Sequence, residues 1–473
     1  MSEPVVAGRR QWQALAVCLA SAFVNMLDVS IVNVAMPSIE SSLRAGTAEL
    51  QLIVAGYTLA FALTVVPAGR LGDVHGRKKM LMIGVTGFGV CSLLAGLSVN
   101  DWMLAAARVA QGVCAGLANP QVSGLIQQLF PGKQRGRAFG YLGTLVGVAT
   151  ATGPLAGGAI IALAGTEHGW RWIFFINVPI VAVVVPLAAR LLPGKDADRS
   201  STKLDFFGVA LIGVGTLTFM TPFVLSERSA SAGGPGNERW LLLIVAFALL
   251  PVAYFWERHY HRRFRAAVFD PRLLRNAGFC FGAAIGFVYF ASFTSLFLIV
   301  TMVLQAGLGF SALQAGLTAM PYALGSGLAA SLAGRRVAKH GRKLVVAGLC
   351  LALVGMSAIQ VVLRFAPTQW VAVSLACAML LTGLGSGTVV SPNQTLTLAH
   401  VPVEIGGVAG GMLQVSQQIG SAVGMAVVLA GFFANQVAMG ERQAAAHSLL
   451  VSMALIALAV GVAVADWRRT ART

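Results

Sequence analysis

Apolar runs, separated by short polar and basic segments, occupy most of this 473-residue chain. About 20 helical residues, rising 1.5 Å each, cross the roughly 30 Å hydrocarbon core of a bilayer. Runs that meet this length lie near residues 12–36, 50–68, 80–99, 102–122, 137–163, 172–192, 205–225, 240–256, 278–304, 313–333, 344–363, 370–392, 408–433 and 447–465. The pattern therefore predicts an all-α polytopic membrane protein with 14 transmembrane helices.

Composition is typical of a membrane protein, and it bears on how the positive net charge is interpreted. Hydrophobic residues make up 57% of the chain and charged residues 11%, whereas a soluble domain carries about 25% charged residues. The formal net charge of +17 is spread over short segments between apolar runs. No continuous basic patch forms, so we expect contact with the lipid bilayer and no nucleic-acid partner.

The distribution of lysine and arginine sets the orientation. With 14 spans, 27 of the 34 basic residues fall on one side of the membrane, 6 on the other, and Arg108 inside a span. Basic residues accumulate in short cytoplasmic loops. The sequence thus predicts a multi-pass protein of the cytoplasmic (inner) membrane with both termini in the cytoplasm.

An internal repeat divides the chain. The segments Gly69–Lys78 and Gly334–Lys343 lie 265 residues apart and match at six of ten positions. Two similar halves are a known plan among transporters. We therefore expect a six-helix bundle at residues 1–203, an inserted helix pair with a basic cytoplasmic linker at 204–276, and a second six-helix bundle at 277–473.

One carboxylate, Asp28, falls inside the first apolar run. A charged residue at the bilayer centre costs at least about 2.5–3.5 kcal/mol, so such residues usually serve a function. Counting along their spans puts Asp28 roughly 24 Å from the inner face and Arg108 roughly 10 Å below the outer face. Both then lie in the outer half at similar depth, and we expect them to interact. The pair either couples transport to protons or only fastens two helices together.

Several segments resemble signatures of the major facilitator superfamily, in particular its 14-spanner drug:proton antiporters. The resemblance is carried by the stretch around Asp28 and by Gly69–Lys79, Leu104–Ala115, Gly153–Gly158 and Trp170–Pro179. Two positions depart from the family pattern. Leu52 stands where the family commonly has Trp, and Ala338 replaces the acidic residue of the second-half loop, which suggests a latch that differs between the halves.

The resemblance implies roles for two of these segments. A conformational latch that closes the cytoplasmic side would use Gly69, Asp73, Gly76, Arg77 and Lys78. The alternative is a loop that only sets topology, which accounts for the basic residues but not for Asp73. An antiporter hinge would use Gly153, Pro154, Gly157 and Gly158. The glycines by themselves predict a close-packing helix face.

A substrate cavity in such a protein needs apolar walls with a few polar groups. Candidate groups are Asn25, Asn33, Tyr57, Asn119, Gln121, Tyr289, Phe290, Phe293, Asn393, Gln394, Gln414 and Gln417. Each polar member can instead form a hydrogen bond between helices. Because Asp28 has no second acid at its level, we expect neutral, zwitterionic or monocationic amphiphiles as substrates.

The sequence as a whole predicts a proton-coupled efflux transporter that works by alternating access as a monomer. The alternatives are a dedicated exporter of one metabolite or antibiotic, an uptake symporter, and a non-transporting membrane sensor or scaffold. No phosphate-binding loop of the Gly-x-x-x-x-Gly-Lys-[Ser/Thr] form is present, so ATP is not expected to drive transport. We expect no enzyme activity, no metal and no cofactor; the proton gradient supplies the energy.

Overall fold

Helices form nearly all of the computed structural model, which describes residues 8–45, 47–165, 167–194, 205–229, 241–264, 273, 275–310, 312–399 and 401–470. The helices are long because the apolar runs are about 20 residues or longer, and glycine and alanine allow them to pack closely. Ten helical segments of the described residues are long and apolar enough to cross a membrane. The remaining helices are consistent with 14 spans, and the all-α prediction is confirmed.

The N-terminal half consists of α1 (Arg9–Leu43), α2 (Thr47–His75), α3 (Arg77–Gly96), α4 (Asp101–Leu129), α5 (Lys133–Ala164), α6 (Gly169–Phe175) and α7 (Asn177–Leu191). The sequence predicted one span over 172–192, but the helix is interrupted at Ile176. Pro179 follows in the first turn of α7. Its missing N–H costs no hydrogen bond there, because the first N–H groups of a helix have no carbonyl partner within the helix. The break brings Asn177 to the start of a helix.

The C-terminal half consists of α11 (Ala277–Met302), η2 (Val303–Gly307), α12 (Ala312–His340), α13 (Arg342–Phe365), α14 (Thr368–Thr397), η3 (Val403–Ile405), α15 (Gly406–Met439) and α16 (Glu441–Thr470). The internal repeat is visible at one turn of each half. Gly76 (φ 101°) precedes α3 and Gly341 (φ 54°) precedes α13. Side chains disfavour this backbone region, so glycine permits the tight turn at both places.

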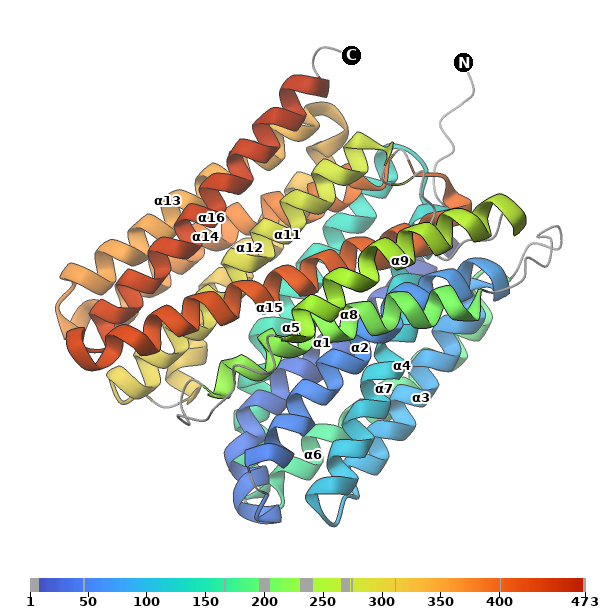
Figure 1. The fold of residues 1–473 in the computed structure, drawn as a ribbon. Coiled ribbons are helices and arrows are strands. Elements are labelled where there is room, and N and C mark those ends of the chain that lie inside the picture. Colours follow the sequence, from blue (N-terminus) through green and yellow to red (C-terminus); the bar gives the residue numbers. More distant parts are fainter. Residues whose placement is uncertain are drawn as a thin grey trace.

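Two further helices, α8 (Phe206–Ser229) and α9 (Leu241–Phe264), lie between the halves (Figure 1). Met220 of α8 packs against Ala62 of α2 and Ala422 of α15, one helix from each half. Asp205 joins the pair, because its carboxylate accepts hydrogen bonds from the Gly208 amide and the Trp256 indole, both at 2.8 Å. Of the inserted pair, α8 therefore packs against both halves, and α9 packs on α8.

The three-part division of the chain stays a prediction. Its basic linker, Glu257–Asn276, lies partly outside the described residues, which omit 265–272 and 274.

The halves meet along the first half of α5. A methyl group on Gly334 of α12 would lie 2.4 Å from the Gly136 carbonyl oxygen, and one on Gly147 would lie 2.9 Å from that of Ala323. These backbones are too close for larger side chains. Because α5 starts on the predicted cytoplasmic side, the halves are closed there. The outer half of α5 instead packs on α1.

Candidate functional site

Asp28 and Arg108 meet inside the N-terminal half. The Arg108 Nη1 donates to the Asp28 Oδ2 at 2.5 Å, and the side chains are 2% and 0% exposed. The interaction expected from their depths is therefore present. Since removing two charges from water costs several kcal/mol per ion, the pair persists only with further hydrogen bonds.

Those bonds come from residues to which the sequence assigned no individual role. Gln111 donates to Asp28 at 3.0 Å and to the Ser92 hydroxyl at 2.7 Å. Asn177 donates to the same carboxylate oxygen at 2.9 Å and to Ser92 at 3.1 Å. Gln111 and Asn177 lie in segments that resemble family signatures, which is the one signal that could have found them. Four helices, α1, α3, α4 and α7, thus converge on one carboxylate.

Arg108 is enclosed on its remaining sides. It also donates to the Gln111 Oε1 at 2.7 Å and to the Ile53 carbonyl at 3.3 Å. Its guanidinium lies 4.3 Å from the Tyr57 ring centre and 5.9 Å from that of Phe174. The cation therefore keeps several partners when the charge on Asp28 changes. Arg108 is thus shielded from lipid by protein groups on all sides.

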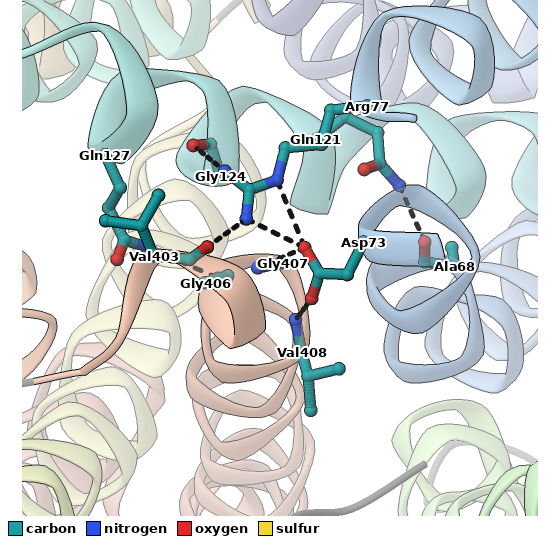
Figure 2. A network of polar contacts seen from close by, with 10 residues as sticks. All are labelled: Ala68, Asp73, Arg77, Gln121, Gly124, Gln127, Val403, Gly406, Gly407 and Val408. Carbon is teal, nitrogen blue, oxygen red and sulfur yellow. Dashed lines mark hydrogen bonds and ion pairs between the residues drawn. The ribbon is translucent and has the colours of Figure 1, made fainter. Parts of the chain in front are cut away.

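Two of the predicted latch residues, Asp73 and Arg77, connect the two halves (Figure 2). The Asp73 carboxylate accepts from the backbone amides of Gly407 at 3.2 Å and Val408 at 3.1 Å. These amides have no carbonyl partner within their own helix, because α15 begins at Gly406. A helix N-terminus also favours a negative charge. Arg77 holds the same carboxylate at 2.8 Å. A charge of the N-terminal half therefore caps a helix of the C-terminal half.

Further contacts across the same seam support the latch. Arg77 donates across the seam to the carbonyl of Val403, which precedes α15, and within its own half to the Gly124 carbonyl of α4 at 2.5 Å. Gln127 donates to the Gly406 carbonyl at 3.3 Å. Gly69 permits the approach, because a methyl group there would lie 2.4 Å from the Gly407 carbonyl oxygen.

Lys78 does not reach the other half. Its ammonium donates to the carbonyls of Ala189 at 2.6 Å and Leu192 at 3.0 Å, at the C-terminal end of α7. Cations stabilise helix C-termini. Lys78 therefore fastens α3 to α7 in the N-terminal half.

The second copy of the repeat makes a different structure. Arg342, which corresponds to Arg77, pairs with Asp466 of α16 at 2.5 Å and donates to Asn393 of α14 at 2.6 Å. Asp466 supplies the acid that Ala338 lacks, although from another helix. All these partners belong to the C-terminal half, so this copy is an internal clamp, in line with the asymmetry inferred from Ala338.

The candidate cavity residues divide by their contacts. Gln121 donates to the Ala68 carbonyl at 2.7 Å and Asn393 to the Gly282 carbonyl at 2.8 Å, which favours a role between helices for both. Tyr57 covers Arg108, and Tyr289 bonds to Ser386.

The other candidates have fewer recorded contacts. Asn25 is buried, and its amide nitrogen has no hydrogen-bond partner among the described residues. The half-buried members are Asn119, Phe290, Phe293, Gln394, Gln414 and Gln417. The side chain of Asn33 lies outside the described part of the structure. The structure therefore does not gather the candidates into one site.

The glycines of the predicted hinge lie against α1, in a helix that continues through Pro154, whose side chain is not among those described. A methyl group on Gly153 would lie 2.3 Å from the Ser30 hydroxyl and one on Gly157 2.9 Å from Ile31, whereas Gly158 faces open space. The packing face is present; hinge motion stays a prediction.

These contacts predict unequal effects of adding one methyl group to α5. Gly153→Ala is expected to destabilise the protein by about 1–3 kcal/mol, because Ser30 and the α1 backbone must shift. Gly158→Ala is the matched control and should be neutral or slightly stabilising, since alanine favours helix. Thermal unfolding of the two purified variants in one detergent measures the difference. Equal melting temperatures would contradict the tight α1–α5 contact.

Comparison with known proteins agrees with this architecture. The family model described as Major Facilitator Superfamily matches residues 18–425 and 282–472. The chain is 35% identical over 426 residues to a probable actinorhodin transporter of Streptomyces coelicolor, covering 90% of this chain and 73% of the relative. It is 33% identical over 430 residues to the puromycin resistance protein pur8 of Streptomyces alboniger, covering 89% and 81%.

A solved structure shares the fold at low sequence identity. The proton:xylose symporter XylE, bound to 6-bromo-6-deoxy-D-glucose, superposes with a TM-score of 0.67 at 15% identity, covering 96% of this chain and 95% of the other. The family model spans nearly the whole chain and the relatives are transport and resistance proteins. The chain therefore belongs to the Major Facilitator Superfamily and is a membrane transporter rather than an enzyme.

Proposed function

We propose that this transporter exports small amphiphilic molecules from the cytoplasm in exchange for protons. The buried Asp28–Arg108 pair carries the proposal. Arg108, Gln111 and Asn177 all donate to the Asp28 carboxylate, so a change in its charge alters the contacts between their helices. The relatives named for actinorhodin transport and puromycin resistance support export of antibiotic-like molecules. The substrates are neutral, zwitterionic or monocationic.

Proton binding at Asp28 is the proposed chemical step. Protonation removes the negative charge of the pair and weakens the attraction between α1 and α4. Arg108 then keeps Gln111, the Ile53 carbonyl and the two rings as partners. Substrate and proton are therefore bound in turn. Asp28 takes up a proton when the site is open to the outside and releases it when the site is open to the cytoplasm.

The latch is proposed to control access to this site from the cytoplasm, while the gradients set the direction of transport. In the arrangement described, Asp73 ties α2 to the start of α15 on the predicted cytoplasmic side. Access from the cytoplasm requires this tie to break while the halves rock about the α5–α12 contact. The proposed cycle is alternating access by a monomer in the cytoplasmic membrane, with both termini in the cytoplasm and no cofactor.

A dedicated exporter of one antibiotic is the second candidate. It is favoured by the two relatives described above, since each is named for a single compound. A panel of unrelated amphiphiles in an efflux-deficient host separates the two. Protection against several chemical classes supports a broad exporter, and protection against one supports a dedicated exporter.

The test of proton coupling uses inverted vesicles that contain the wild-type protein. A pH gradient of one unit should drive about tenfold accumulation for each proton exchanged in an electroneutral cycle. Collapse of the gradient with an ionophore should abolish accumulation, and substrate should release protons from the purified protein. Accumulation that is independent of the gradient contradicts coupling, and a protein that moves no substrate would instead act as a sensor.

A further inference from the structure

The two halves place a tyrosine at the same position of the internal repeat. Tyr57 of α2 and Tyr322 of α12 are 265 residues apart, the offset that also relates Gly69 to Gly334. Their packing matches. A methyl group on Gly112 would lie 2.3 Å from the Tyr57 carbonyl oxygen, and one on Gly383 would lie 2.1 Å from that of Tyr322. The tyrosines are therefore equivalent in space as well as in sequence.

The surroundings of the two tyrosines differ in charge. The Tyr57 ring covers the Arg108 cation of the proton site. The Tyr322 hydroxyl instead donates to the Ser386 hydroxyl at 2.5 Å, and Ser386 also bonds to the Tyr289 hydroxyl. Where the N-terminal half holds an ion pair, the C-terminal half holds neutral hydroxyls.

These hydroxyls lie beside a group of rings that we call the aromatic cluster, Tyr289, Phe290, Phe293, Phe297 and Tyr322. Phe293 stacks on Tyr289 at 5.5 Å between ring centres and on Tyr322 at 5.2 Å, with interplanar angles of 10° and 25°. Phe297 meets Tyr322 edge-on at 4.7 Å, and Phe290 meets Tyr289 edge-on at 5.4 Å. The cluster thus combines stacked and edge-on ring contacts, the two arrangements that aromatic pairs favour.

The three phenylalanines of the cluster share one face of α11, because they are spaced three and four residues apart. Other residues of α11 make its packing contacts: Ser292 donates to the Ser452 carbonyl of α16 at 2.8 Å, and Thr294 bonds to Ser421 of α15 at 2.9 Å. The three phenylalanines are only half-buried.

The neighbours of α11 show where this face points. One neighbour, α12, contributes the Tyr322 ring and packs on α5 of the other half; the other, α15, packs on α2. The face between them is therefore directed toward the N-terminal half. Among the described residues, α11 has no extensive contact with any helix of that half.

We propose that the aromatic cluster is a substrate subsite for a planar aromatic ring, which its half-buried phenylalanines contact, while the buried hydroxyls of Tyr289, Tyr322 and Ser386 bond to one another and hold the cluster in place. This inference rests on the proposed function and assigns the halves different tasks, the proton to the N-terminal half and the ring to the C-terminal half. A flat ring fits because stacking uses its whole face. Neutral or singly cationic rings suit the subsite, because aromatic faces attract cations without a carboxylate.

Two probes of equal charge and different shape test the subsite. Ethidium is a planar aromatic monocation, and tetraphenylphosphonium is a monocation whose rings cannot lie flat together. In nanodiscs with the full chain, Phe293→Leu is expected to raise the ethidium Kd about 3- to 10-fold and to change the tetraphenylphosphonium Kd less than about twofold. Phe293→Trp, which keeps a flat ring, should retain ethidium binding.

Phe365→Leu is the matched control, since Phe365 is exposed at the end of α13. It should leave both affinities unchanged. The subsite is disproved by an unchanged ethidium Kd in Phe293→Leu, by equal loss of both probes, or by absence of ethidium binding to the wild type. Proton-driven accumulation of either probe by wild-type vesicles is a separate measurement, so failure of the proposed function is distinguished from failure of this subsite.

Discussion

Asp28→Asn is expected to abolish proton-driven accumulation of substrate while leaving exchange down a substrate gradient measurable. The amide has nearly the size of the carboxylate but cannot take up a proton. It also leaves Arg108 buried without its counter-ion, which costs about 3–5 kcal/mol in buried pairs. Accumulation under an imposed pH gradient and counterflow without one, measured in the same proteoliposomes, separate coupling from transport.

Asp101→Asn controls for the loss of one acidic charge. Asp101 begins the helix that carries Arg108, and its carboxylate bonds to the neighbouring Trp102 amide. This variant should accumulate substrate like the wild type. Thermal unfolding of Asp28→Asn must show that the variant folds. A folded Asp28→Asn protein that still accumulates substrate against its gradient would show that the pair only fastens α1 to α4.

Asp73→Asn is expected to shift the protein toward states that are open to the cytoplasm. The substitution removes the charge that caps α15 and pairs with Arg77. A hydrogen bond to a charged group contributes about 1.5–3 kcal/mol, so losing one changes the ratio of closed to open states about 10- to 100-fold. Spin labels at Lys79 and Lys339, both exposed and in different halves, report the shift as longer distances.

Glu404→Gln is the matched control for the latch. Glu404 is an exposed acid in η3, next to Val403, so the variant removes the same charge close to the same seam. Its distance distribution should match that of the wild type. If Asp73→Asn also leaves the distribution unchanged, the contact with α15 contributes nothing to closure.

The sequence was sufficient to predict the transmembrane architecture and one ion pair. Burial of apolar helices follows from composition and run length, because hydrocarbon accepts only segments with satisfied backbones. Asp28 and Arg108 could be matched because charges are rare inside a membrane and their depths follow from the helical rise. The repeat around Gly69 and Gly334 predicted two related halves.

The sequence did not show which uncharged residues meet Asp28. Ser92 and Asn177 are ordinary residues of apolar spans, and only the break at Ile176 and the packing of α3 and α7 bring them to Asp28. Lys78 was grouped with the latch through the family resemblance, yet its side chain reaches α7 instead. Side-chain direction at a helix start depends on which neighbour packs there.

From the sequence alone follow a membrane protein with two related halves and a buried acid at the depth of a buried base; the orientation in the membrane stays a prediction. The tertiary structure decided which groups complete that pair, that Asp73 caps α15, and that Tyr57 and Tyr322 meet different surroundings. The physical reason is the range of each effect. Transfer to lipid acts on every residue of a span, whereas a hydrogen bond or stacked ring requires atoms from distant helices to meet within a few ångströms.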